Sequence, residues 1–334
     1  STQPHSGKTT TVSDNASRWG IDVSEKLGGG MTAIAKLESQ LDASGESATQ
    51  ATRNRGVGLV SKFGTVIAGV WDTPYKDIRT ATELFPEYIG DLRNLFSIGG
   101  TGTFATRGWD LRTANSILYR SPSLNGFEIS YLYSADAVVL VGTEDNRQRV
   151  DTIGLKYSKG PLYVAYARES HRFNGGAVGS TTELSNPTET GDRLGASYNF
   201  GAFKVTGLWQ DLKDLGGVGV PTAVATSVKR RSWALGGAYT AGNNVFKAQY
   251  AKAGSLSNTA SGGSGDDTGA TMWALGWDHL FSKTVKGYVA YAKTDNNTGS
   301  VFTVNGPAGA HTDSVAPGTG SDPQAWSVGM IVDF

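Results

Sequence analysis

The stretch WSVGMIVDF, Trp326–Phe334, alternates apolar and polar side chains at the C-terminus of the chain. Successive side chains of a β-strand point to opposite faces, so a strand here would have one apolar and one wet face. The apolar face would carry Trp326, Val328, Met330, Val332 and Phe334. Phe127–Asp136, Ser232–Thr240 and Thr271–His279 repeat the pattern. The alternation predicts a sheet with an apolar outer surface and a polar interior.

Strand candidates with this period, bounded by Gly, Asn, Asp or Pro, recur along almost the whole chain. Fifteen are predicted, namely Ser17–Glu25, Met31–Leu41, Asn54–Lys62, Thr65–Asp72, Arg112–Arg120, Phe127–Asp136, Arg149–Ser158, Leu162–Ser170, Arg193–Tyr198, Phe203–Asp211, Ser232–Thr240, Val245–Ala253, Thr271–His279, Thr284–Thr294 and Trp326–Phe334.

The connections alternate between tight turns, such as LGGG and NFGA, and eight long polar loops. This alternation is typical of an outer-membrane β-barrel, with short turns on one side of the membrane and long loops on the other. Such barrels have an even number of strands, because an unpaired edge in lipid leaves backbone groups without hydrogen bonds. We therefore expect sixteen strands, the first preceding Ser1 or formed poorly by Ser1–Val12.

Composition supports an all-β chain and excludes several site types. Only 18% of the 334 residues are charged, the net charge is zero, and no charged block suggests a nucleic-acid partner. Cysteine is absent, and His5, His171, His279 and His311 lack the close spacing of a zinc site. We expect no cofactor, no metal and no catalytic residues. A soluble β-sandwich with an adhesive role remains the alternative fold, although aromatic residues near strand ends favour the membrane.

The third long loop, Thr73–Leu111, contains the segment TELFPEYIGDLRN, Thr82–Asn94. Structureless loops this long are usually functional or disordered. Its apolar residues need burial, and the interior of the barrel can provide it; they are Tyr75, Ile78, Leu84, Phe85, Tyr88, Ile89, Leu92, Leu95 and Phe96. A helix over Thr80–Phe85 would help to align the recurring carboxylates Glu83, Glu87 and Asp91, although Pro86 interrupts it.

Several stretches together resemble the trimeric general porins of the Gram-negative outer membrane. They are SRWGIDVSEKLGGGMTAIAKLES, RNRGVGLVSKFGTVIAG, RTANSILYRSPSLNGFEISYLYS, PEYIGD and the terminal Phe334. The resemblance implies a sixteen-stranded multi-pass barrel, one domain over residues 1–334, that assembles as a homotrimer among outer-membrane lipid and lipopolysaccharide. Each barrel would enclose a water-filled pore narrowed by residues 73–111, and Phe334 resembles the signal for membrane insertion.

The same resemblance and the strand alternation identify candidate residues of the pore constriction. Glu83, Glu87 and Asp91 match an acidic family pattern in the third loop. Arg18 and Arg112 match basic positions of the family, and alternation places Arg18, Lys36 and Arg112 on the inner face. Arg53 and Arg55 share one face, which is the inner one if the porin register holds. The candidate basic wall is therefore Arg18, Lys36, Arg53, Arg55 and Arg112.

The predicted function is passive diffusion of ions and small hydrophilic solutes through the pore, where charge rings set selectivity. Porins often carry Arg where this chain has Val70 and Leu118, so we expect a thinner basic wall and weak ion selectivity. A channel specific for an anion or small organic acid is the alternative. An outer-membrane hydrolase is a further one, since His279 alone could serve as a base.

Overall fold

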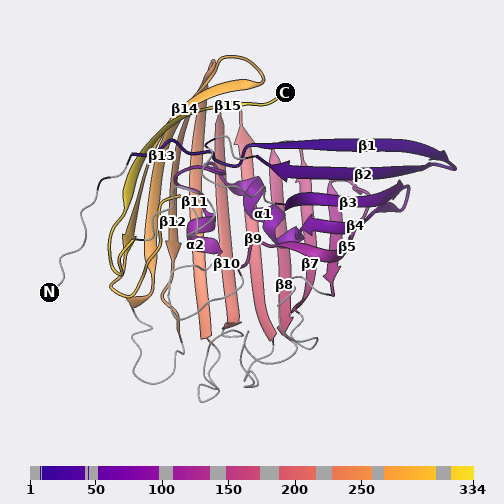
Figure 1. Cartoon of the computed structure of the whole chain (residues 1–334), viewed down its shortest axis with the longest axis horizontal. Coiled ribbons are helices and arrows are strands. Elements are labelled where there is room, and N and C mark those ends of the chain that lie inside the picture. Colours follow the sequence, from indigo (N-terminus) through magenta and orange to yellow (C-terminus); the bar gives the residue numbers. More distant parts are fainter. Residues whose placement is uncertain are drawn as a thin grey trace.

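One antiparallel sheet of fifteen strands contains all the strands of the chain that the structure describes (Figure 1). The structure is a computed structural model that describes residues 8, 10–41, 44, 52–97, 108–135, 148–173, 188–215, 228–257, 267–305 and 317–334. Each strand pairs with its neighbours in sequence, and β1 and β15 are the two edges of the sheet. The predicted all-β fold is confirmed, and one further strand between these edges would complete sixteen.

The strands are β1 (Arg18–Gly28), β2 (Met31–Gln40), β3 (Thr52–Ser61), β4 (Gly64–Asp72), β5 (Arg112–Arg120), β6 (Phe127–Ser134), β7 (Gln148–Lys159), β8 (Leu162–Phe173), β9 (Thr188–Phe200), β10 (Phe203–Leu215), β11 (Val228–Ala241), β12 (Asn244–Ala253), β13 (Ala270–Leu280), β14 (Val285–Asn296) and β15 (Gln324–Val332). Every predicted strand is present. Several extend further toward the long loops, because backbone pairing continues past the apolar alternation, as between Thr190 and Lys213.

The two faces of the sheet differ as the alternation predicts. We call the face that carries helices α1 and α2 the inner face and the opposite one the outer face (Figure 1). Large apolar side chains are exposed on the outer face, including Ile21, Val57, Ile129, Leu235 and Val328. Among the described residues, no helix has the length and apolarity needed to cross a membrane.

The outer face of β8 to β11 changes from aromatic to charged toward the long loops. One cross-strand row contains Tyr166, Leu194, Trp209 and Trp233. Two residues further along, the next row on this face contains Arg168, Asp192, Asp211 and Arg231. Aromatic rings concentrate at the interface between the membrane and water, so these two rows mark the depth at which the outer face leaves the apolar layer.

Helix α1 (Pro74–Thr82) opens the third loop. It begins where the Thr73 hydroxyl accepts a hydrogen bond from the Lys76 amide and Pro74 occupies the first turn, both common signals of a helix start. It ends at Thr82, so Thr80–Phe85 is not a continuous helix and Glu83 is already in extended backbone. The short α2 (Arg93–Phe96) follows.

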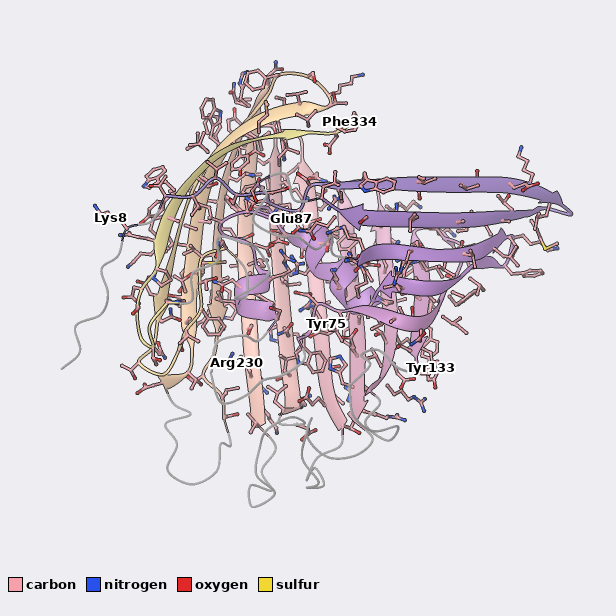
Figure 2. The ribbon with its side chains drawn as sticks, in the orientation of Figure 1. Lys8, Tyr75, Glu87, Tyr133, Arg230 and Phe334 are labelled. Atoms are coloured by element: carbon pink, nitrogen blue, oxygen red, sulfur yellow. The ribbon has the colours of Figure 1, made fainter. Side chains whose placement is uncertain are left out.

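The third loop packs on the inner face, as the sequence predicted from its apolar residues. All nine of those side chains are buried. They fit because glycines of the wall leave room: Gly154, Gly191, Gly195, Gly236 and Gly276 face Pro74, Trp109, Ile78, Leu84 and Phe85, respectively. Figure 2 shows Tyr75 and Glu87 within the curve of the sheet. The third loop therefore packs closely against strands that are distant in sequence, because these glycines have no side chain to occupy the space.

Gly276→Val should push the third loop off the wall. A Cβ at this position would lie 2.7 Å from Cε1 of the fully buried Phe85. Overpacking of this kind typically costs about 1 to 3 kcal/mol. We expect faster proteolysis within the third loop of the folded protein and a lower thermal unfolding midpoint. The control Gly207→Val adds a side chain on the outer face, where the nearest atom is 3.6 Å away, and should change neither. Equal behaviour of the two variants would contradict this close packing.

Candidate functional site

Two of the three predicted acidic residues lie in a buried cluster of charges around Arg79 of α1. Glu83 and Asp91 both pair with Nη1 of Arg79, Asp91 at 3.3 Å, and Nε of Arg79 lies 2.9 Å from Oδ2 of Asp110. All four side chains are at most 5% exposed. The Leu92 amide donates to Glu83 at 2.6 Å, and the Arg93 amide donates to Asp91 at 2.7 Å. The cluster fixes the path of the third loop.

Burial and charge set the protonation of these loop carboxyls in opposite directions. Burial raises the pKa of Glu83 well above its usual range, because desolvation outweighs the attraction of Arg79. Burial would also raise the pKa of Asp91, but Arg93 and Arg79 together hold it below the usual range. Arg193 and Arg79 likewise keep the pKa of Asp110 low despite its burial. Asp91 and Asp110 therefore supply the negative charge that Arg79 requires.

Glu87 is the predicted acidic residue that retains substantial exposure. Its side chain is 30% exposed and pairs with Nη2 of Arg93 at 2.8 Å. Its backbone has a φ of 68°, in the left-handed region, and its amide donates to Asp91 at 3.1 Å. The pair of Glu87 and Arg93 thus forms the part of this acidic segment that solvent and solutes can reach.

The predicted basic residues Lys36, Arg53 and Arg112 each have an acidic partner that the sequence did not single out as part of the site. Lys36 lies 3.2 Å from Asp22 and 3.6 Å from Glu38, and Arg53 also pairs with Glu38. Nε of Arg112 lies 3.0 Å from Oδ1 of Asp72, the carboxyl that also pairs with Lys76 at 2.7 Å. The positive charges of Lys36, Arg53 and Arg112 are therefore balanced by carboxylates of the same wall.

Arg55 does not share the inner face with Arg53. The pairing between β2 and β3 shifts between Leu37 and Ser39, so an irregularity reverses the alternation after Arg53. Arg55 lies opposite Leu37 and Val70, on the exposed outer face with Val57. The expectation of an inward Arg55 is therefore wrong. Arg18 on β1 is exposed and lies opposite Gln40 on β2. Its positive charge acts on Glu38, which also belongs to β2.

Arg193 on β9 is a central residue that the sequence analysis missed. Its fully buried guanidinium lies 2.6 Å from Oδ1 of Asp110, donates to the backbone oxygen of Tyr75 at 3.2 Å, and also bonds the side chain of Gln210. It stacks over the Tyr75 ring at 4.0 Å. Only its position in the strand pattern, a charged residue on the inner face beneath a long loop, could have indicated this role.

A second segment contacts residues Gly90 and Asn94 of the third loop. It follows β14, and its residues Phe302, Thr303 and Val304 are buried. The Gly90 amide donates to the Val304 carbonyl at 2.7 Å, and the side chain of Asn94 accepts from the Thr303 amide at 2.9 Å. In the described part of the chain, this segment therefore packs on the inner face together with the third loop.

The histidines do not gather into one site. His171 is buried against Trp109 and lies 2.9 Å from Glu169, whereas His279 lies on β13, 2.9 Å from Asn244. In the part of the chain that the structure describes, no group of three His, Asp or Glu side chains could hold a metal ion. His5 and His311 lie outside that part.

The similarity of the chain to known proteins identifies its family. The family model described as Gram-negative porin matches residues 1–299. The chain belongs to this family. It is 30% identical over 257 residues to outer membrane porin protein 32 of Delftia acidovorans, covering 72% of this chain and 66% of the relative. It is 32% identical over 233 residues to an outer membrane porin protein of Bordetella pertussis, covering 63% and 56%, respectively. This porin chain thus spans somewhat less than two thirds of these relatives.

Solved porins share the fold. The anion-selective porin from Comamonas acidovorans superposes with a TM-score of 0.70 at 26% identity, over 95% of this chain and 88% of that one. The trimer form of OmpT from Vibrio cholerae gives 0.67 at 17% identity, over 98% and 94%. These similarities confirm the predicted porin fold, and the family and its outer membrane relatives confirm the predicted outer-membrane location.

Arg79→Met should release the third loop of this porin from the wall. Removing one partner of a buried ion cluster leaves uncompensated carboxylates and typically costs about 3 to 5 kcal/mol. We expect rapid proteolysis within residues 73–97 of the folded protein and noisy single-channel currents. Arg120→Met is the matched control, because its pair with Asp77 at 2.7 Å is half-exposed and worth about 0 to 1 kcal/mol. If both variants stayed equally protected, the cluster would not hold the loop.

Proposed function

We propose that this porin forms a passive, water-filled pore for ions and small hydrophilic solutes, narrowed by the third loop. The observation that supports it most is the packing of residues 73–97 and 108–111 on the inner face of the sheet, where the loop occupies space that would otherwise be open. Its buried apolar side and its partly exposed pair of Glu87 and Arg93 suit a loop with a dry face toward the wall and a wet face toward the pore. We assign the chain no catalytic step.

Conductance in planar bilayers tests the pore directly. We expect step-like openings after reconstitution of the purified chain, and larger steps when the third loop is shortened between Thr73 and Leu111. Absence of steps from a folded, detergent-extracted protein would contradict the proposal. Unchanged step size after the deletion would instead show that the loop does not narrow the pore.

We further propose weak ion selectivity. Lys36, Arg53 and Arg112 each have a carboxylate partner, and Arg79 is surrounded by carboxylates. Paired charges produce dipoles whose fields fall off faster than those of free charges, and salt screens them further. The acidic set of Glu83, Glu87 and Asp91 then acts at the constriction mainly through Glu87. Arg18, which is exposed, would add positive charge near the wall.

An anion-selective channel is the second candidate, because the solved relative from Comamonas acidovorans is described as anion-selective. The compensated basic wall of this chain argues against a strong preference of that kind. A hydrolase has less support, since His279 lies beside aromatic rings of Trp277 and Phe281 and bonds Asn244. A reversal potential close to zero in a salt gradient distinguishes weak selectivity from the anion channel.

We propose that the porin assembles as a homotrimer in the outer membrane, as the solved trimer form of OmpT does. Its outer face would contact lipid, and Arg168 and Arg231, 45% and 75% exposed, lie where lipopolysaccharide phosphates would be. Phe334, two residues after β15 and labelled in Figure 2, would serve as the insertion signal. A monomeric mass of the detergent-extracted protein by light scattering would contradict the trimer.

Glu87→Gln should shift conduction toward anions. The substitution removes one negative charge at the exposed rim of the third loop, while Arg93 keeps its positive charge and its pair with Asp91. We expect the reversal potential in a tenfold salt gradient to move by several millivolts in the anionic direction. Glu128→Gln is the control, since it removes an inward carboxylate that pairs with Lys156 at the short-turn end of the sheet. A shift of the same size in both variants would mean that Glu87 has no special position in the pore.

A further inference from the structure

Arg230 differs from the two other buried arginines that the structure describes, Arg79 and Arg193. The guanidinium of Arg79 has three carboxyl groups around it, including the charged Asp91 and Asp110, and that of Arg193 has Asp110 and Gln210. Arg230 is 1% exposed, yet within the described residues no carboxylate lies within ion-pair distance of it. The buried cation therefore lacks the counter-charge that its counterparts have.

Hydrogen bonding at Arg230 is also incomplete. Nη2 donates to the carbonyl of Thr268 at 2.9 Å, and the guanidinium carbon lies 5.3 Å from the ring centroid of Phe302. Nε and Nη1 are buried, and neither has a hydrogen-bond partner among the residues that the structure describes. A buried charge without partners costs several kcal/mol, and buried donors in proteins are almost always satisfied by protein, water or an ion.

Ser232 adds a third donor on the same face of β11. It is the next inward residue after Arg230, about 6.6 Å further along the strand, since a strand rises about 3.3 Å per residue. Its hydroxyl is fully buried, and no described residue forms a hydrogen bond with it. Among the described residues, the fully buried Leu212 lies directly opposite Arg230 on β10. Figure 2 shows Arg230 toward the end of the sheet where the long loops begin.

We propose that Arg230, with Ser232 beside it, binds a small inorganic anion of the chloride class. The positive charge and the free donors of Arg230, with the hydroxyl of Ser232, select an anion over a cation. The near-complete burial of both side chains selects a small spherical ion over a carboxylate-bearing solute, which would need space for its organic part. The site lies apart from the predicted constriction, and it does not depend on the pore being passive.

A bound anion would also reinforce the packed interior. Arg230 contacts Thr268, which precedes β13, and Phe302 of the segment after β14, and the neighbouring Thr303 bonds Asn94 of the third loop. An ion that neutralises Arg230 therefore stabilises the place where these loop segments meet. Anything that binds the folded state and not the unfolded state raises the unfolding midpoint with its concentration.

Unfolding of the full chain in detergent, in sodium chloride and in sodium gluconate at equal ionic strength, tests the site. We expect the midpoint of the wild type to rise with chloride concentration and to be lower in gluconate. Arg230→Met should lose this difference. Arg231→Met is the matched control: it removes a neighbouring charge that is 75% exposed and paired with Asp211, and it should keep the chloride effect. Equal midpoints of the wild type in the two salts, or an unchanged chloride effect in Arg230→Met, would overturn the proposal.

Crystals of the wild-type protein grown in bromide provide a test that needs no variant. We expect an anomalous peak within hydrogen-bond distance of Nε or Nη1 of Arg230. A bridging water there, with no anomalous signal, would show that solvent satisfies the guanidinium and that no anion site exists. A bromide peak only at exposed arginines such as Arg231 would have the same meaning.

Discussion

The constraint on which the rest of this structure depends is the two-sidedness of a strand. Alternate side chains must suit an apolar surround on one face and a wet, charged interior on the other. Placing Arg or Lys against the middle of a bilayer costs about 2 to 4 kcal/mol, so the inner face collects most of the charge. One irregularity in β3 is enough to move Arg55 to the outer face while Arg53 stays inside. The pairing register of neighbouring strands thus decides which charged side chains face the interior.

Filling the interior follows from that constraint. A wide sheet encloses more space than its own side chains fill, and the third loop fills part of it. The wall accepts the loop because the inner face of β7, β9, β11 and β13 has glycine where loop side chains arrive. Burying a charge is costly unless an opposite charge lies beside it, so these buried charges depend on one another. Arg79 is balanced by Asp91 and Asp110. Asp91 in turn is balanced by Arg79 and Arg93, and Asp110 by Arg79 and Arg193. The apolar packing and the ion cluster therefore fix the same loop path.

The sequence predicted what depends on local pattern. All fifteen strands and the burial of the third loop could be predicted, because the strand alternation and the apolar residues of the loop are visible in short windows of sequence. The partners of the charges could not be predicted. Asn94 bonds Thr303 and Arg193 bonds Asp110 across long stretches of chain, and such contacts depend on where the loop lies against the wall. Arg55 was misplaced because an irregular pairing has no signature in the alternation itself.

The candidate site shows why composition alone is a poor guide to selectivity. Counting Lys36, Arg53 and Arg112 against Glu83, Glu87 and Asp91 suggests a strong transverse field between a basic wall and an acidic loop. The structure instead pairs each set largely within itself, through Asp22, Glu38 and Asp72 on the wall, and through Arg79 and Arg93 in the loop. Close opposite charges leave only short-range dipoles, which orient polar solutes near the wall and discriminate weakly between anions and cations at a distance. With the pore proposed above, this pairing would leave size and hydration as the chief filters.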